Sequence, residues 1–291
     1  MKKVFDGSCV ALITPFKNDK IDYEKLDELL YLHQVAGTKA ILILGTTGES
    51  PTVSYEEREE MIKFCRQKIQ KCKLLVGAGT NCTRTSIEIA RRAEQLGADG
   101  LLVVTPYYNK CTQEGLYKHY KEIANSVHIP IILYNVPTRT GVNILPETAE
   151  NLSQIDNICG IKEANSDIDH IQEMIKTLAG KMAVYSGNDD LNYYFLSHGA
   201  SGVISVTANL FPELVAGECS LVMQGDLKEA KQLDRRLSGL NKALFVETNP
   251  IPVKFGASIL KMCDNELRLP LTPLSEKYLS YVQTEVEKVK M

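Results

Sequence analysis

The chain has 291 residues, of which 44% are hydrophobic and 24% charged, and its formal net charge is -3. This composition is that of a globular protein with a sizeable core, and the nearly balanced charge gives no basis for binding nucleic acid or an anionic membrane. No window approaches the roughly 20 apolar residues of a membrane span, and no signal-peptide pattern opens the chain. We therefore expect a cytoplasmic protein with small-molecule partners, in which the eight scattered cysteines are reduced thiols.

Short apolar runs rich in β-branched residues recur from the N-terminus to about residue 206. They lie at 9–16, 39–45, 73–79, 100–106, 129–136, 158–164, 182–187 and 202–206. Because these runs are continuous rather than alternating, they predict parallel strands that are buried on both faces.

Segments of helical length separate these runs. Apolar residues recur at three- and four-residue spacing in, for example, 22–37 and 86–100. Several segments end at the glycine that commonly follows a helix, namely Gly37, Gly97, Gly180 and Gly199. Eight strand–helix units predict an α/β fold of the (β/α)8 TIM-barrel type, and a doubly wound open sheet is the alternative.

The strand pattern stops near residue 225. Three further helical segments follow, at 226–245, 252–263 and 273–289. We therefore expect two units, a catalytic barrel over 1–225 and a C-terminal helical domain over 226–291. The stretch from Asn249 to Pro252 is expected to be a rigid joint within the second unit.

Lys162 interrupts one of the predicted buried strands, where an unpaired ammonium is costly. Strand parity puts it on the same face as Gly160 and Ala164, whose small size is expected to leave space beside the amine, and puts Glu163 on the opposite face. Burial disfavours the charged form of an amine, so one interpretation is a nucleophile that forms a Schiff base with a carbonyl substrate. The alternative is a strand-end ion pair with Glu163 or another carboxylate.

Hydroxyl groups follow several other strands, at the barrel end where active sites of this fold lie. Tyr134 ends the strand next to that of Lys162, and Thr46, Thr47 and Tyr108 follow two earlier strands. Neutral hydroxyls can relay the protons that imine chemistry requires. Each tyrosine, taken singly, is also compatible with an ordinary core position.

The remaining charged groups favour a carboxylate substrate over a phosphate or a metal. Arg139 follows Tyr134 and suits bidentate capture of a carboxylate, although an exposed loop arginine is equally compatible. The loops after the last two strands, the usual phosphate site in such barrels, carry Asp189 and Asp190 and no nearby cation. The five histidines show no ligand spacing. We expect a lysine-dependent mechanism with no metal and no cofactor.

Three motifs together resemble a known family. "GTTGES" at 45–50, "YNVPTRTG" at 134–141 and "GIKEA" at 160–164 are similar to the motifs of dihydrodipicolinate synthases. That family lies within the pyruvate-dependent class I aldolases, which also include N-acetylneuraminate lyase. The resemblance extends over essentially the whole chain.

The resemblance implies a catalytic role for four residues. Lys162 would form an imine with pyruvate, so that the only covalent group is the substrate itself. Tyr134, Thr46 and a Tyr108 that reaches in from a neighbouring subunit would form the proton relay. This implies a homo-oligomer, and the family commonly forms a tetramer built as a dimer of dimers.

The resemblance also implies the substrates and their binding residues. Thr47 would bind the pyruvate carboxylate, and Arg139 that of L-aspartate 4-semialdehyde. Gly187 and Ile204 would line the pocket through backbone groups. The product would be 4-hydroxy-tetrahydrodipicolinate, on the pathway to diaminopimelate and lysine. The alternatives are an N-acetylneuraminate or 2-keto-3-deoxy sugar acid lyase, and a keto-acid sensor that lacks catalysis.

One departure from the family concerns regulation. Members that lysine inhibits strongly carry two histidines shortly after "GTTGES" and a glutamate after the third strand, where this chain has Tyr55, Arg58 and Thr85. Asn81 and Tyr107 do match that pattern. We therefore expect weak or no inhibition by lysine.

Overall fold

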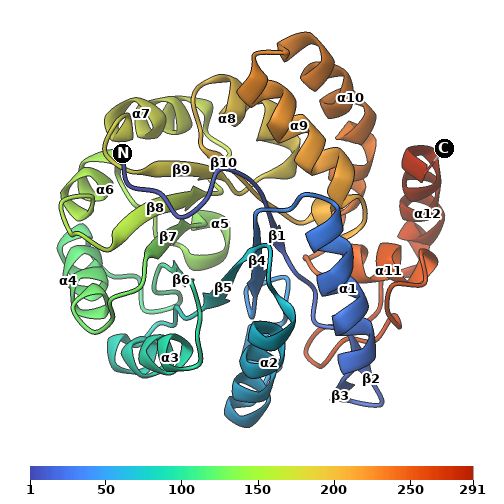
Figure 1. The fold of residues 1–291 in the computed structure, drawn as a ribbon, viewed down its shortest axis with the longest axis horizontal. Coiled ribbons are helices and arrows are strands. Elements are labelled where there is room, and N and C mark those ends of the chain that lie inside the picture. The colour runs from blue at the N-terminus through green and yellow to red at the C-terminus, as the bar shows by residue number, and fades with distance from the viewer. Residues whose placement is uncertain (291) are drawn as a thin grey trace.

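The computed structural model describes residues 1–290, and within them eight parallel strands close into a barrel (Figure 1). The barrel strands are β1 (Gly7–Ala11), β4 (Ala40–Ile43), β5 (Lys73–Gly77), β6 (Gly100–Val104), β7 (Ile131–Asn135), β8 (Ile158–Glu163), β9 (Ala183–Ser186) and β10 (Gly202–Ser205). Closure comes from the pairing of β1 with both β10 and β4. The predicted barrel is confirmed, and the alternative of an open sheet is wrong.

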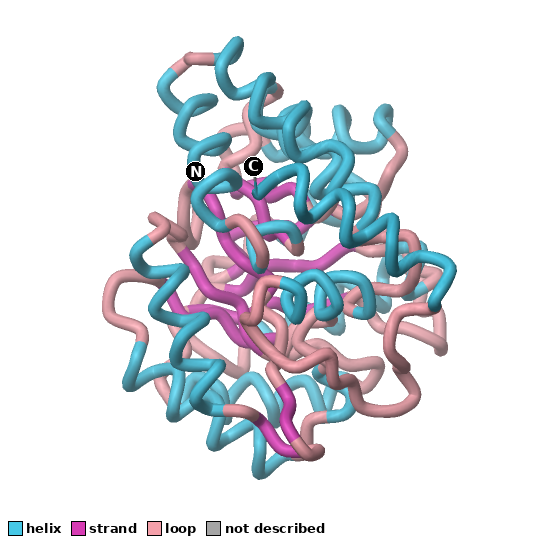
Figure 2. The backbone as a smooth tube through the Cα atoms, turned by 90° about the vertical axis from the view of Figure 1, so that its right-hand side faces the viewer, coloured by secondary structure: helices cyan, strands magenta, loops and turns pink. Residues whose placement is uncertain are grey.

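Helices cover the outside of the barrel, as Figure 2 shows by the strands enclosed among helices. The helices that follow the strands are α1 (Tyr23–Val35), α2 (Tyr55–Lys68), α3 (Thr83–Gln95), α4 (Gln113–Ala124), α5 (Pro137–Thr140), α6 (Pro146–Leu152), α7 (Ile168–Leu178), α8 (Asn192–Ser197) and α9 (Pro212–Gln224). Short 3-10 turns precede or follow some of them, at Ser50–Thr52, Asp189–Leu191 and Thr207–Asn209. The four glycines predicted to end helices all have left-handed φ angles, which suit a residue without a Cβ.

The C-terminal part consists of α10 (Leu227–Ala243), α11 (Ile251–Ile259) and α12 (Glu276–Lys290). Helix α10 packs against α9, and α12 contacts both α10 and α11. All three predicted helical segments are therefore present, whereas the division of the chain into units at residue 225 stays a prediction. Pro252 lies inside the first turn of α11, so the expected joint is in part a helix start.

The barrel interior is packed at its N-terminal end. The ring of Tyr185 stacks on Phe5, with their centroids 4.4 Å apart, and its hydroxyl donates to the Phe5 carbonyl at 2.9 Å. Small and aliphatic side chains from alternate strand positions, such as Cys9, Leu42 and Leu75, fill the layers between. Because that end is closed, the interior is open to substrates only at the carboxyl ends of the strands.

All eight cysteines are free thiols, and six of them are buried. Over residues 1–290, no helix combines the length and the apolar character needed to cross a membrane.

Candidate active site

Lys162 lies on β8 between two aromatic residues of the neighbouring strands. Its Cα is paired with that of Tyr134 on β7 and that of Tyr185 on β9. The side chain is only 5% exposed, and its Nζ lies 4.5 Å from the centroid of the Tyr134 ring. It faces a cavity of about 600 Å³ at the carboxyl ends of the strands. The amine is therefore buried and still has room beside it.

Glu163 points to the other side of β8, as parity predicted. Its carboxylate accepts hydrogen bonds from Asn135 Nδ2 at 3.0 Å and from the Asn165 backbone N–H at 2.7 Å, and it lies 3.3 Å from His170 Nε2. This contact raises the pKa of His170. The alternative in which Lys162 pairs with Glu163 is wrong, because the carboxylate is fully engaged on the helix side of the strand.

The space beside the lysine comes from a different glycine than expected. A Cβ on Gly160 would lie 2.8 Å from Cε2 of Tyr185, so this glycine accommodates the tyrosine ring rather than a substrate. A Cβ on Gly187 would lie 3.0 Å from Cε of Lys162 and 2.8 Å from Cβ of Ala164. The expectation for Gly160 was therefore wrong, because parity gives the face of a residue but not its neighbours on other strands.

The turn after β4 brings Thr46 and Thr47 to the cavity. Thr47 is 2% exposed, and its Oγ1 accepts a hydrogen bond from Asn249 Nδ2 at 2.9 Å. The backbone carbonyl of Asn249 accepts from Arg139 Nη2 at 3.1 Å. Asn249 thus connects two of the predicted binding residues, and its own Oδ1 is buried without a partner among residues 1–290.

The other predicted site residues lie at different depths. Arg139, in the last turn of α5, and Gly187 line the cavity. Ile204 is 1% exposed in the barrel interior and is not among the cavity-lining residues that the structure describes. Tyr108 is 91% exposed, with a φ of 74°, so the structure holds it outside the cavity of its own chain.

A second cavity of about 620 Å³ adjoins the first. The two share Thr46, Tyr134 and Arg139 among their lining residues, and the second extends to Tyr55 and Arg58. Arg58 donates to the carbonyl oxygens of Ser50 and Gly77 at 3.2 and 3.4 Å, so its charge is held in this cleft.

The backbone amides after β10 are already occupied. Asp189 Oδ2 accepts from the N–H groups of Val206 and Thr207 at 2.8 and 3.0 Å. In such barrels these amides are a usual phosphate site, and here a carboxylate of the chain itself fills it. Among the described residues, no group of three His, Cys, Asp or Glu side chains is arranged to hold a metal ion.

Comparison with known proteins agrees with this geometry. Residues 4–289 match the model of the dihydrodipicolinate synthetase family. A 4-hydroxy-tetrahydrodipicolinate synthase of Thermotoga neapolitana is 48% identical, over 94% of this chain and 95% of the relative. The crystal structure of dihydrodipicolinate synthase from Thermotoga maritima superposes with a TM-score of 0.97 at 45% identity, covering 99% of both chains.

A further crystal structure shows a relative with bound pyruvate. The chloride-inhibited dihydrodipicolinate synthase from Acinetobacter baumannii, complexed with pyruvate, has a TM-score of 0.96 at 43% identity, over 98% of this chain and 99% of that one. Because the family model and these relatives all match nearly the whole length, this chain belongs to the dihydrodipicolinate synthetase family.

Proposed function

We propose that this protein is a lyase that condenses pyruvate with L-aspartate 4-semialdehyde to give 4-hydroxy-tetrahydrodipicolinate. The observation that carries the proposal is the buried amine of Lys162, which faces a cavity beside Tyr134 and Thr46 in a chain of this family. The reaction would proceed in the cytoplasm, on the pathway to diaminopimelate and lysine.

In the proposed mechanism, the Lys162 amine attacks the ketone carbon of pyruvate and water leaves, which gives an imine. Loss of a proton from the methyl group gives an enamine, whose carbon attacks the aldehyde carbon of the second substrate. The aldehyde oxygen takes up a proton and becomes a hydroxyl group, and the imine with Lys162 re-forms. The amino group of that substrate then closes the ring on the imine carbon and releases the lysine. The reaction needs no cofactor, because the substrate itself supplies the electron-accepting imine.

The proton steps and the carboxylates have separate groups. We assign the proton relay to Tyr134, Thr46 and Tyr108, whose hydroxyls can pass protons while they remain neutral. Thr47 would hold the pyruvate carboxylate. Arg139 would hold the carboxylate of the second substrate, since a guanidinium suits bidentate binding. Gly187, which lines the cavity, is proposed to contact the substrate through its backbone groups. The same role for Ile204 stays a prediction, because Ile204 is not among the described residues that line the cavity.

Borohydride reduction in the presence of pyruvate tests the imine. Mass spectrometry of the digested protein is expected to show a pyruvate adduct on the peptide that contains Lys162. A coupled assay with aspartate semialdehyde, and separately with a sialic or keto-deoxy acid, then distinguishes the synthase from a sugar-acid lyase. Absence of the adduct, or turnover of the sugar acid alone, would refute the proposal.

We propose that the protein acts as a homotetramer, a dimer of dimers in which Tyr108 enters the site of a neighbouring subunit. The 91% exposure of this tyrosine at a positive φ angle supports a role between subunits, because a single chain gives the ring no partner cavity. Sedimentation is expected to give four times the chain mass of 32.4 kDa. Tyr108→Phe is expected to lower kcat without changing the assembly, and a fully active monomer would contradict this.

We propose that lysine inhibits this enzyme weakly or not at all. Arg58 places a cation in the second cavity, and Thr85 lacks the carboxylate that would hold the ammonium of the effector. The affinity for lysine should be lower by more than an order of magnitude than in strongly inhibited family members, if each charged contact is worth roughly 1.5–3 kcal/mol. A coupled assay is expected to show little inhibition at millimolar lysine, whereas a sub-millimolar inhibition constant would contradict the proposal.

A further inference from the structure

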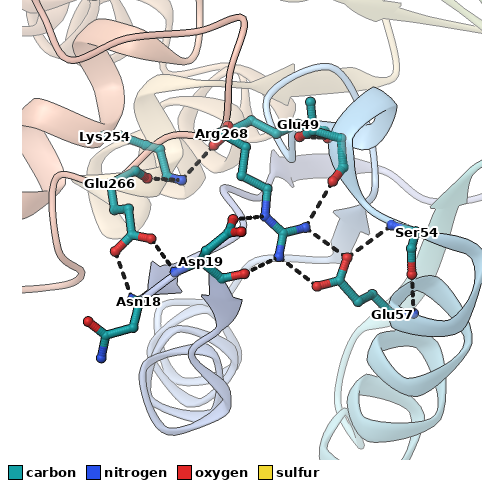
Figure 3. A network of polar contacts seen from close by, with 9 residues as sticks. Asn18, Asp19, Glu49, Ser54, Glu57, Lys254, Glu266 and Arg268 are labelled. Carbon is teal, nitrogen blue, oxygen red and sulfur yellow. Dashed lines mark hydrogen bonds and ion pairs between the residues drawn. The ribbon is translucent and has the colours of Figure 1, made fainter.

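Three segments that are far apart in the sequence meet in one network of polar contacts (Figure 3). They are the turn between the short strands β2 (Phe16–Lys17) and β3 (Lys20–Ile21), the segment that runs from the Thr46–Thr47 turn into α2, and the C-terminal stretch 254–268. A continuous set of ion pairs and hydrogen bonds joins them. None of these contacts belongs to the reaction proposed above.

The centre of this network is an ion pair between Lys254 on α11 and Glu49. Their nitrogen and oxygen atoms lie 2.5 Å apart, and their side chains are 0% and 1% exposed. The ammonium also donates to the Glu266 carbonyl at 2.6 Å and lies 4.2 Å from the centroid of the Phe16 ring. Glu49 Oε2 accepts from the backbone N–H of Arg268 at 3.1 Å.

Glu49 is also part of the turn that carries the two threonines. Its backbone N–H donates to the carbonyl of Thr46 at 3.1 Å. Its φ and ψ are 52° and 36°, a left-handed conformation that is unfavourable for a residue with a side chain and persists only when the surroundings enforce it. Leu44, just before the turn, has a φ of 56°. The turn is therefore bounded on both sides by left-handed residues, and Lys254 holds one of them.

Arg268 holds the next part of the same segment. Its guanidinium donates to both oxygens of Glu57 at 2.6 and 2.7 Å and to the carbonyl of Thr52 at 2.8 Å. It also donates to the carbonyl of Asp19 at 2.6 Å. Glu57 in turn accepts from the backbone N–H of Ser54, the N-cap residue that precedes α2. The C-terminal stretch thus contacts the segment at its start and again at its end.

A buried ion pair is a weak source of stability, because desolvation of the two charges offsets their attraction. In some proteins such a pair instead selects a single conformation of the surrounding backbone. We propose that Lys254 is a positioning residue of the reaction, which holds Glu49 and through it fixes the Thr46–Thr47 turn against the cavity. This inference rests on the proposed function, and it gives helix α11 a part in positioning the active-site turn.

The test compares Lys254→Met, Glu49→Gln and the double variant in the full-length protein. Each single variant leaves a buried group without its partner, so a lower melting temperature is expected for both. The double variant leaves no unpaired charge and is expected to regain most of the lost melting temperature. Its kcat should remain at least about ten-fold below that of the wild type, with a higher KM for pyruvate, because a displaced turn misaligns the hydroxyls.

Two controls use residues of the same network. Glu266→Gln removes a carboxylate that accepts from the N–H groups of Asn18 and Asp19. Within residues 1–290, these groups make no hydrogen bond with the Thr46–Thr47 turn, so kcat should remain unchanged. Lys254→Arg keeps the positive charge, so its kcat should be higher than that of Lys254→Met, although below that of the wild type. If kcat of the double variant recovers together with its melting temperature, the pair is merely structural and the inference is wrong.

A crystal structure of the double variant gives a readout that does not depend on the substrates. The backbone at 45–50 is expected to leave its present path, and an unchanged turn would overturn the inference. Failure of the proposed function is a different result, in which the wild type itself forms neither the pyruvate adduct nor product.

Discussion

Lys162→Met is expected to lower kcat by at least about a thousand-fold, because it removes the group that forms the covalent intermediate. Methionine has nearly the length of the lysine stem and fills the same buried space on β8, so packing around the 5% exposed side chain is retained. The measurement is steady-state turnover of pyruvate and aspartate semialdehyde, together with borohydride trapping. No adduct should form on the peptide that contains residue 162.

Lys176→Met is the matched control, since this lysine lies exposed in the last turn of α7. It should retain the wild-type kcat and the adduct on Lys162. Far-UV circular dichroism and a melting curve for both variants establish that each is folded. Residual turnover of the Lys162 variant within ten-fold of the wild type would show that the reaction does not proceed through this amine.

The fold was largely predictable because each strand of such a barrel is buried on both faces and therefore has a continuous apolar sequence. Each barrel strand overlaps one such run. The overlap is poorest for β1, which spans Gly7–Ala11 where the apolar run spans 9–16. The hairpin of β2 and β3 was missed, because two residues per strand leave no periodicity to recognise. The sequence feature that could have indicated the hairpin is the Asn18–Asp19 pair in its turn. Both residues have left-handed φ angles, and Asn and Asp tolerate this conformation in tight turns.

Site residues were predictable where they lie at the ends of barrel strands. They were not predictable where packing between distant parts of the chain brings them to the site. Lys162, Tyr134 and Arg139 follow from their places at strand ends. Asn249 contacts Thr47 from 202 residues away, and Lys254 contacts Glu49 from 205 residues away. The sequence around each of these residues does not indicate which distant residue it will contact. For Asn249, the sequence showed only the asparagine–proline pair, which predicted a joint and not a contact with the site.

Gly187→Ala should lower kcat by about a hundred-fold while the protein stays folded, because the added methyl group has no free space beside the lysine. Its Cβ would lie 2.8 Å from Cβ of Ala164, 2.9 Å from the carbonyl oxygen of Glu163 and 3.0 Å from Cε of Lys162. Two of these three atoms belong to short or backbone groups that cannot rotate away. The end of β8 must therefore shift, and Lys162 shifts with it, at a cost in stability of roughly 1–3 kcal/mol.

Gly217→Ala on α9 is the matched control, because its Cβ would meet only Cδ1 of Leu233, at an ordinary 3.5 Å. An alanine within a helix should raise stability by about 0.5–1 kcal/mol and leave kcat unchanged. Turnover and the rate of borohydride trapping are measured for both variants with melting curves. A Gly187→Ala enzyme with wild-type kcat would mean that the lysine has more freedom than the contacts allow, and that the close fit around it is not required for imine formation.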